Sequence, residues 1–171
     1  LTVTDFSPVM VDITRGVFAE AGLSDGATIE IANARQLTYP NQTWDGIIFA
    51  FNGLMCMRGQ ADRLEALAEI YRVIKPRGKF IFTANDREKG EHAELWKKES
   101  VLPGCQSGDR WHETESTPVF MHSSTESETR EELLNAGFKI IRSPLRSEVA
   151  SENSLVKNFA GETRFYIAER K

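Results

Sequence analysis

The sequence has little of what would cross-link the chain or hold it in a membrane. Its 171 residues include only two cysteines, Cys56 and Cys105, which are too few for a disulfide framework in a chain of this length. We therefore expect free thiols and a cytoplasmic protein. The apolar runs are only a few residues long. A membrane-spanning helix needs roughly 20 apolar residues, so we expect no membrane partner.

An excess of one charge is also missing. The chain carries 21 basic and 25 acidic residues, and no dense run of lysine and arginine. Proteins that follow nucleic-acid phosphates present a basic surface, so a nucleic-acid partner is not indicated. No spacing of histidine, cysteine and acidic residues resembles a metal site. The apolar fraction of 40% is that of an ordinary globular chain, and the length fits one domain.

Segments typical of strands and helices alternate along most of the chain, which indicates an α/β fold with a Rossmann-like, doubly wound sheet. A polar, non-helical connection joins the last two strands, so we expect a mostly parallel sheet with an antiparallel C-terminal strand. The most apolar segment, 44–51, has the pattern of a strand buried on both faces. The expected strands are 1–4, 28–32, 44–51, 79–84, 119–122, 138–142 and 164–168, and the expected helices are 8–21, 61–74 and 126–134.

Local signals mark the ends of the first helix. Ser7 is a good N-cap residue, and Pro8 suits the first helical position because its missing N–H would have no partner there. Gly22 is placed to end the helix. Apolar residues at helical spacing predict a core-facing side that consists of Met10, Ile13, Val17 and Ala21.

Further along the chain, Thr125 and Glu128 have the spacing of a capping box, which predicts the start of the helix 126–134.

Asp5 follows the first predicted strand and precedes this helix. In open parallel sheets, ligands bind outside the carboxyl ends of the strands. A carboxylate in that position can accept hydrogen bonds from both ribose hydroxyls of a nucleoside cofactor. The alternative is that Asp5 only supports the turn and the N-terminal end of the helix dipole.

Several segments, taken in order, resemble the class I S-adenosylmethionine-dependent methyltransferases. The most specific is the helix, Lys-Pro-x-Gly turn and strand in LAEIYRVIKPRGKFIFT (67–83). The resemblance covers almost the whole chain. The other matching segments are LTVTDFSPVM (1–10), IANARQLTYP (31–40), WDGIIFAF (44–51), LLNAGF (133–138) and FYIAERK (165–171).

The resemblance implies S-adenosylmethionine as the cofactor and a role for each matching residue. Asp5 would bind the ribose hydroxyls, and Phe6 and Met10 would flank the adenine. Asn33 and Ala34 would meet the adenine edge, although the family often has aspartate where Asn33 stands; an amide oxygen can still accept from the adenine amino group. The cofactor's methionine part and its methyl group would lie near Ala50, Phe51 and Asn52. The simpler alternatives are core positions for Phe6 and Met10 and a turn position for Asn33.

One part of the family pattern has no counterpart here. The resemblance starts at the family's second strand, so its first strand and glycine-rich loop are missing. That strand lies centrally in the family's sheet. Without it, both of its neighbours would expose unpaired backbone groups. We therefore expect residues 1–171 to be a single methyltransferase domain that is incomplete at its N-terminus by about 30 or more residues, the scale of a βαβ unit. Such a fragment should bind the cofactor poorly.

The segment 85–118 is polar and weakly patterned, and we interpret it as a substrate-side insertion or lid. Its tryptophans, Trp96 and Trp111, could line a pocket for the methyl acceptor, or anchor the insertion to the domain. We expect a small-molecule acceptor, by analogy of fold. A general base is needed only if the acceptor must lose a proton. The candidates are His112, His122 and Tyr39, and the alternative for each histidine is an ordinary solvated side chain.

Two other functions remain open at this level. A nicotinamide-dependent oxidoreductase of similar topology would also use an acid at the end of its second strand. A non-catalytic, methyltransferase-like scaffold that binds a protein partner would fit Asn33 and the missing loop. The Lys75–Gly78 turn and the C-terminal strand pair favour the methyltransferase.

Overall fold

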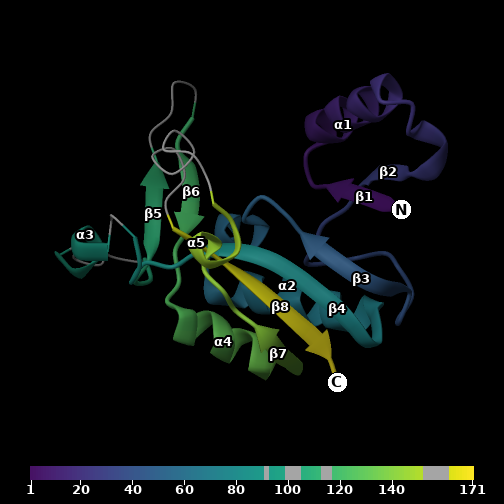
Figure 1. The fold of residues 1–171 in the computed structure, drawn as a ribbon. Coiled ribbons are helices and arrows are strands. Elements are labelled where there is room, and N and C mark those ends of the chain that lie inside the picture. Colours follow the sequence, from purple (N-terminus) through teal and green to yellow (C-terminus); the bar gives the residue numbers. More distant parts are fainter. Residues whose placement is uncertain (91–92, 99–104, 113–116, 152–161) are drawn as a thin grey trace.

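The computed structural model describes residues 1–90, 93–98, 105–112, 117–151 and 162–171. Strands and helices alternate along most of the chain, as the sequence predicts (Figure 1). The elements at 93–98, 109–112 and 146–149 were not predicted, and the last of them is a short helix in the connection that was expected to be non-helical. The strands are β1 (Thr2–Asp5), β2 (Thr28–Ile31), β3 (Trp44–Phe49), β4 (Ile74–Asn85), β5 (Asp109–His112), β6 (Val119–His122), β7 (Phe138–Arg142) and β8 (Thr163–Arg170). The helices are α1 (Pro8–Glu20), α2 (Gln60–Val73), α3 (Ala93–Lys98), α4 (Glu126–Asn135) and α5 (Arg146–Val149), with single 3-10 turns η1 (Ser24–Gly26) and η2 (Gly53–Cys56).

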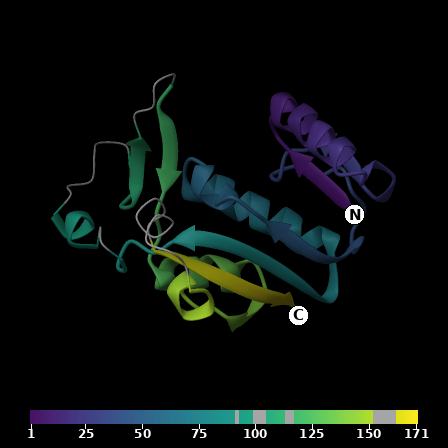
Figure 2. The same ribbon diagram turned by 45° about the horizontal axis from the view of Figure 1, so that its top comes forward.

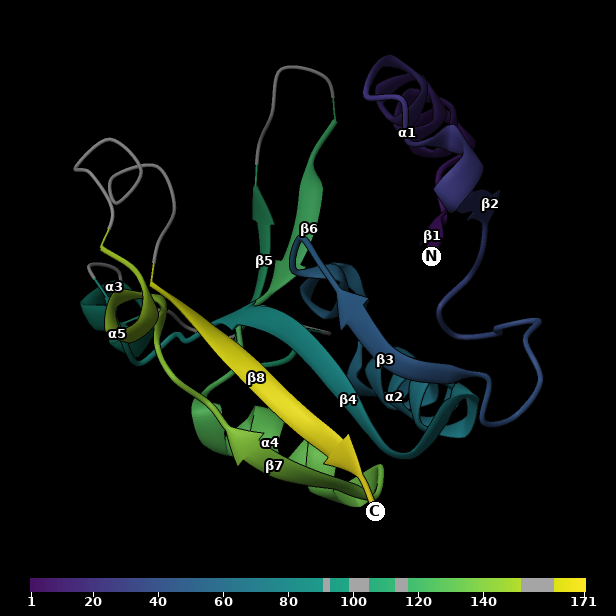
Figure 3. The same cartoon turned by 45° about the vertical axis from the view of Figure 1, so that its right-hand side comes forward.

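The main sheet has the strand order β3-β4-β8-β7. Strands β3 and β4 are parallel, whereas β8 runs antiparallel to both of its neighbours, which confirms the expected antiparallel C-terminal strand. Helices α2 and α4 contact each other and lie behind this sheet in Figure 3. The core between helices and sheet is aromatic: the ring of Phe80 stacks on Phe82, and Phe82 stacks on Tyr166.

The Lys-Pro-x-Gly turn is a bulge at the start of β4. The pairing of β3 with β4 shifts register here, because Trp44 faces Ile74 while Gly46 faces Lys79. A Cβ atom on Gly78 would lie 2.8 Å from the carbonyl oxygen of Lys75 and 2.9 Å from that of Asp45. Only glycine therefore fits at this bulge.

Two smaller sheets accompany the main one. Strands β1 and β2 form a parallel pair joined through α1, and this unit lies beside the main sheet (Figure 2). Strands β5 and β6 form an antiparallel hairpin, in which β5 lies within the predicted insertion 85–118 and β6 directly follows it. In the described part of the chain no pairing joins β1 to β3, so each has one open edge.

Two expectations about burial were wrong. Strand β3 is not buried on both faces: Ile48 is 73% exposed, because β3 pairs only with β4 and no described element covers the face that carries Ile48. The apolar side of α1 is also exposed, and Met10, expected in the core, is 46% exposed. Helix α1 contacts its own unit, where Val11 is its buried residue, and its Met10 side lies away from the described elements.

The helix boundaries follow the predicted local signals. The Ser7 hydroxyl accepts a hydrogen bond from the N–H of Met10, and the hydroxyl of Thr125 accepts one from the N–H of Glu128. The Glu128 carboxylate accepts from the N–H of Thr125 in return, which completes a capping box at the start of α4. Within the described residues, no helix is long and apolar enough to cross a bilayer.

Candidate functional site

Asp5 lies at the end of β1, directly before α1, as predicted. Its Oδ1 accepts a hydrogen bond of 2.7 Å from the N–H of Ser7, so the carboxylate supports the turn into the helix. The side chain is nevertheless exposed. Asp5 can therefore fix the turn and still present a carboxylate at the carboxyl edge of the β1–β2 pair, where ligands bind in sheets of this type.

The residues expected around the adenine come from the segments that follow β1 and β2. Phe6 and Met10 are exposed on α1 and the turn before it, which leaves their side chains accessible to a ligand. Asn33 follows β2, and its Oδ1 accepts a hydrogen bond from the N–H of Arg35, so it is a turn residue. Ala34 is partly buried and packs against the core of the main sheet.

The residues expected near the methyl group form a strained turn at the end of β3. Phe51 and Asn52 have φ angles of 54° and 56°, in the left-handed region that residues other than glycine seldom adopt. The Oδ1 of Asn52 accepts a 2.6 Å hydrogen bond from the hydroxyl of Thr83, which ties this turn to β4. Phe51 is 97% exposed, and Ala50 is exposed beside it. Such strain is typical of ligand-binding turns.

Two of the predicted side chains have clear structural partners. The hydroxyl of Tyr39 donates to the carboxylate of Glu30. Burial, together with that carboxylate, raises the pKa of Tyr39 to about 12, so it stays protonated and serves as a donor. The guanidinium of Arg58 lies over the ring of Trp111, 4.3 Å from its centre, which anchors the β5–β6 hairpin to the turn before α2. Trp96 lies on α3 and His112 ends β5, but their side chains lie outside the described residues.

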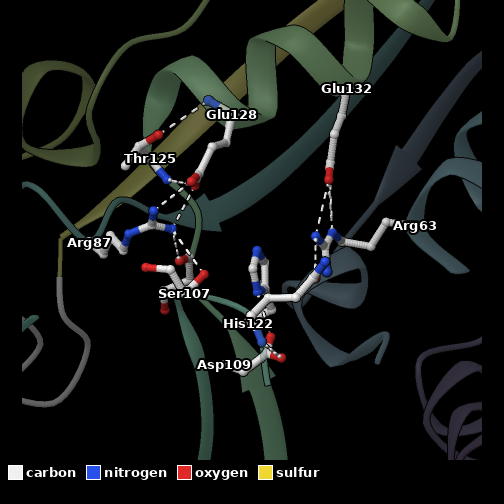
Figure 4. Close-up of polar contacts among 10 residues, drawn as sticks. Arg63, Arg87, Ser107, Asp109, His122, Thr125, Glu128 and Glu132 are labelled. Atoms are coloured by element: carbon white, nitrogen blue, oxygen red, sulfur yellow. Dashed lines mark hydrogen bonds and ion pairs between the residues drawn. The ribbon is translucent and has the colours of Figure 1, made fainter. Parts of the chain in front are cut away.

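A polar cavity of about 140 Å³ lies between α2, α4 and the β5–β6 hairpin. His122, on β6, is one of its walls, and its Nδ1 lies 2.7 Å from Oδ1 of Asp109 on β5. An ionised carboxylate can only accept, so Nδ1 carries the proton and Nε2 keeps its lone pair. Figure 4 shows Nε2 pointing away from Asp109, into the space between two ion pairs.

The first of these pairs joins Arg63 on α2 to Glu132 on α4 at 3.1 Å. Both side chains are buried, and Nε and Nη2 of Arg63 face the carboxylate. Its Nη1 is buried as well and has no hydrogen-bond partner among the described residues. The second pair joins Arg87 to Glu128 with two hydrogen bonds. Burial raises the pKa of Glu128, but its bonds from Arg87 and Thr125 outweigh this effect, so the pKa is lowered.

Sequence reasoning missed Arg63, Asp109 and Glu132. A signal for two of them was present, because Arg63 lies at helical spacing with the buried residues Ala66, Leu67 and Ile70. Glu132 is likewise a buried position of α4. A charge on the buried side of each of two neighbouring helices predicts a buried ion pair, since an isolated buried charge is too costly.

The neutral state of His122 predicts a pH dependence of stability. Burial, with the nearby Arg63, lowers the pKa of His122 despite its bond to Asp109 and the charge of Glu132. In the unfolded chain histidine takes up a proton near pH ~6.5, but in the folded protein only at lower pH. Stability is thus fully present above about pH 6.5 and falls as pH drops below it, since the unfolded state then binds more protons.

Urea unfolding of wild type and His122→Gln, at about pH 7.5 and about pH 5.5, measures this on either side of the ordinary histidine pKa. We expect the variant to lose less of its free energy of unfolding on acidification than the wild type does. Equal losses in the two proteins would show that His122 titrates in the folded state as it does in the unfolded chain.

Comparison with known proteins supports the resemblance. Residues 1–78 match a family model described as a methyltransferase domain. Demethylmenaquinone methyltransferase of Symbiobacterium thermophilum is 36% identical over 77 residues, which are 45% of this chain and 29% of that protein. The ubiquinone/menaquinone biosynthesis C-methyltransferase UbiE of a Marinomonas species is 31% identical over 87 residues, 51% of this chain and 33% of the relative. The matched stretch thus spans about a third of these relatives.

Solved structures share the fold over almost the whole chain. A SAM-dependent methyltransferase of Methanosarcina mazei has a TM-score of 0.80 and 18% identity, covering 99% of this chain and 81% of that one. The [4+2]-cyclase SpnF has a TM-score of 0.70 and 19% identity, with coverage of 99% and 66%. The glycopeptide N-methyltransferase MtfA, solved with S-adenosylmethionine, has a TM-score of 0.67 and 15% identity, with coverage of 99% and 72%. Residues 1–78 are thus similar to the methyltransferase-domain family, and the chain as a whole shares its fold with solved S-adenosylmethionine-dependent methyltransferases.

Proposed function

We propose that the protein transfers the methyl group of S-adenosylmethionine to a small-molecule acceptor. The observation that carries this proposal is the exposed carboxylate of Asp5 at the carboxyl end of β1, within the segment that matches the methyltransferase family. That segment also contains Phe6, Met10, Asn33 and Ala34 and the turn 50–52. The bound cofactor would supply an electrophilic methyl group, so the protein's task is to position the acceptor and exclude water.

The residues present fit this cofactor. Asp5 would offer its exposed carboxylate to the ribose, Phe6 would offer its exposed ring to the adenine, and the strained turn at Phe51 and Asn52 would contact the methionine part. Free thiols at Cys56 and Cys105 suit a cytoplasmic location, which we also propose. The curated relatives' quinone-pathway names point to small-molecule acceptors. We do not assign the relatives' own methyl acceptor to this chain, because the family match ends at residue 78, before the insertion 85–118.

We further propose that a parallel strand from outside residues 1–171 of the same polypeptide lies between β1 and β3. Each of these strands pairs on one side only in the described chain. Apolar side chains, among them Ile31 and Ile48, are exposed on the two strands. A strand inserted there would pair both open edges and cover apolar surface of a kind that monomeric proteins seldom expose. Segment 85–118, with its hairpin, would form the acceptor side.

Calorimetric titration of the full-length protein tests the proposed function. We expect S-adenosylhomocysteine to bind and NAD not to bind. Asp5→Asn should weaken binding of S-adenosylhomocysteine about 10- to 100-fold, because hydrogen bonds to a charged acceptor contribute roughly 1.5–3 kcal/mol. The matched control is Asp12→Asn, since Asp12 is an exposed aspartate on α1 paired with Arg15. This variant should bind S-adenosylhomocysteine as tightly as the wild type does.

The same titration separates the alternatives. Binding of NAD alone would identify an oxidoreductase and end the proposal. Binding of neither ligand would favour a methyltransferase-like scaffold. The cyclase among the structural relatives shows that this fold also supports other chemistry. The ligand that binds, and not the fold, therefore distinguishes the three functions.

A further inference from the structure

The cavity between α2, α4 and the hairpin has features that the proposed cofactor site leaves unused. Nη1 of Arg63 is buried with no partner in the described chain, although the Arg63 side chain is only 5% exposed. An unpaired buried donor costs about 1–3 kcal/mol. Such a group is retained where a ligand oxygen completes it, and Arg63 lines this cavity.

The second feature is a hydrogen-bond acceptor, Nε2 of His122, which also lines the cavity. Because Nδ1 of His122 is bound to Asp109, Nε2 is the nitrogen that faces the cavity (Figure 4). A ligand group that pairs with both side chains must accept a hydrogen bond from Nη1 of Arg63 and donate one to Nε2 of His122. A hydroxyl group does both, whereas a carboxylate only accepts and an ammonium only donates.

The charges around the cavity favour a neutral ligand. The guanidinium groups of Arg63 and Arg87 are each paired with one glutamate, which leaves the carboxylate of Asp109 as an additional negative charge beside neutral His122. An anionic ligand would therefore be repelled. Among the described residues, the charged groups around His122 are Asp109 from β5, Arg63 from α2, Glu128 and Glu132 from α4, and Arg87 from the segment after β4, whereas η2, which also packs against β6, contributes none.

The cavity is also linked, through a second hollow, to the segment that follows the turn 50–52. The turn 50–52 leads directly into η2, whose Leu54 and Met55 line a second, smaller hollow. Arg63, His122 and Glu132 line both hollows, so the two are neighbours. In size, about 140 Å³ is close to the ~150 Å³ of an engineered cavity that binds one benzene ring.

We propose that this cavity binds the hydroxyl group of a neutral phenol- or enol-type acceptor, with its oxygen between Nη1 of Arg63 and Nε2 of His122. This inference rests on the proposed function. The hydroxyl proton passes to Nε2 as the O–H bond breaks, and the imidazolium that forms is ion-paired with Asp109. The oxygen keeps the electron pair, is stabilised by Arg63, and becomes the more nucleophilic anion.

Fluorine NMR with two probes of one shape, 4-fluorophenol and 4-fluorotoluene, tests the proposal on the full-length protein. We expect 4-fluorophenol to bind and 4-fluorotoluene to bind at least about tenfold more weakly, since it leaves both polar walls unpaired. His122→Gln should weaken the phenol about tenfold, whereas Arg35→Gln, an exposed arginine that pairs with Asp62 and Glu65, should have no effect.

Two further readouts separate binding from folding. Phenol binding by the wild type should weaken as the pH falls and His122 takes up a proton, and this dependence should vanish in His122→Gln. Replacing Arg63 alone leaves Glu132 buried and unpaired, so we use Arg63→Met combined with Glu132→Leu, which removes both charges and should fold. We expect the folded double variant to lose phenol binding.

Equal binding of the two probes, or of the phenol by wild type and the double variant, would overturn the hydroxyl site. Titration with S-adenosylhomocysteine is independent of these results. A protein that binds S-adenosylhomocysteine but not the phenol keeps the proposed function and loses this inference. One that binds the phenol alone keeps the pocket and loses the methyltransferase.

Discussion

Asp86→Ala should lower the free energy of unfolding by about 3 kcal/mol, the low end of the ~3–5 kcal/mol expected when one partner of a buried ion pair is removed. Asp86 directly follows β4, and its side chain is 1% exposed. Its Oδ2 accepts hydrogen bonds from Nε and Nη2 of Arg164 on β8, at 3.1 and 2.9 Å. The variant leaves a guanidinium that is itself only 8% exposed. Glu126 remains 3.2 Å away, which is why the low end applies.

Urea unfolding of wild type and variant at neutral pH measures this loss. The matched control is Asp45→Ala, since Asp45 pairs with Lys75 at 2.7 Å but is largely exposed. Exposed pairs contribute little because water and salt screen them, so this variant should be nearly as stable as wild type. Similar losses from both aspartates would mean that burial does not distinguish the two pairs, and would contradict the expected role of Asp86.

Phe80→Ala should cost about 3–5 kcal/mol, the range for truncating a buried aromatic residue. Phe80 is on β4, fully buried, and its ring lies 4.9 Å from Phe82 and 5.4 Å from Phe138. Alanine would leave a void where the main sheet meets α2 and α4, and the backbone pairs of β4 on both sides prevent the void from closing.

Chemical denaturation with an exposed phenylalanine as the control checks this prediction. Phe51→Ala removes the same ring from a position that is 97% exposed, so the free energy of unfolding should hardly change. The free energies of unfolding of the two variants should therefore differ by most of the loss expected for Phe80→Ala. Equal stability of the two variants would show that the aromatic stack on β4 does not hold the fold together.

The local elements could be predicted from neighbouring residues. Ser7 caps α1, the capping box of Thr125 and Glu128 starts α4, and the last strand pairs antiparallel, each as the sequence indicates. These signals act over a few residues and need no distant partner. Burial was harder to predict: an apolar strand pattern placed Ile48 inside and a helical stripe placed Met10 inside, yet both are exposed.

The proposed pocket shows the same division. His122 was named from its residue type, but its partner Asp109 and the Arg63–Glu132 pair were not. Arg63 and Glu132 are 69 positions apart, and no local rule relates two such residues. Periodicity tells which side of a helix is buried, and it does not tell which helix packs against that side.

The sequence by itself determined the order and type of most elements, though not of α3, β5 and α5, together with the family resemblance and the position of Asp5 after its strand. The tertiary structure alone decided which strands carry open edges and which charged side chains meet in a buried cavity. The physical reason is that backbone preferences and caps are local, whereas burial and charge pairing depend on surfaces brought together by folding.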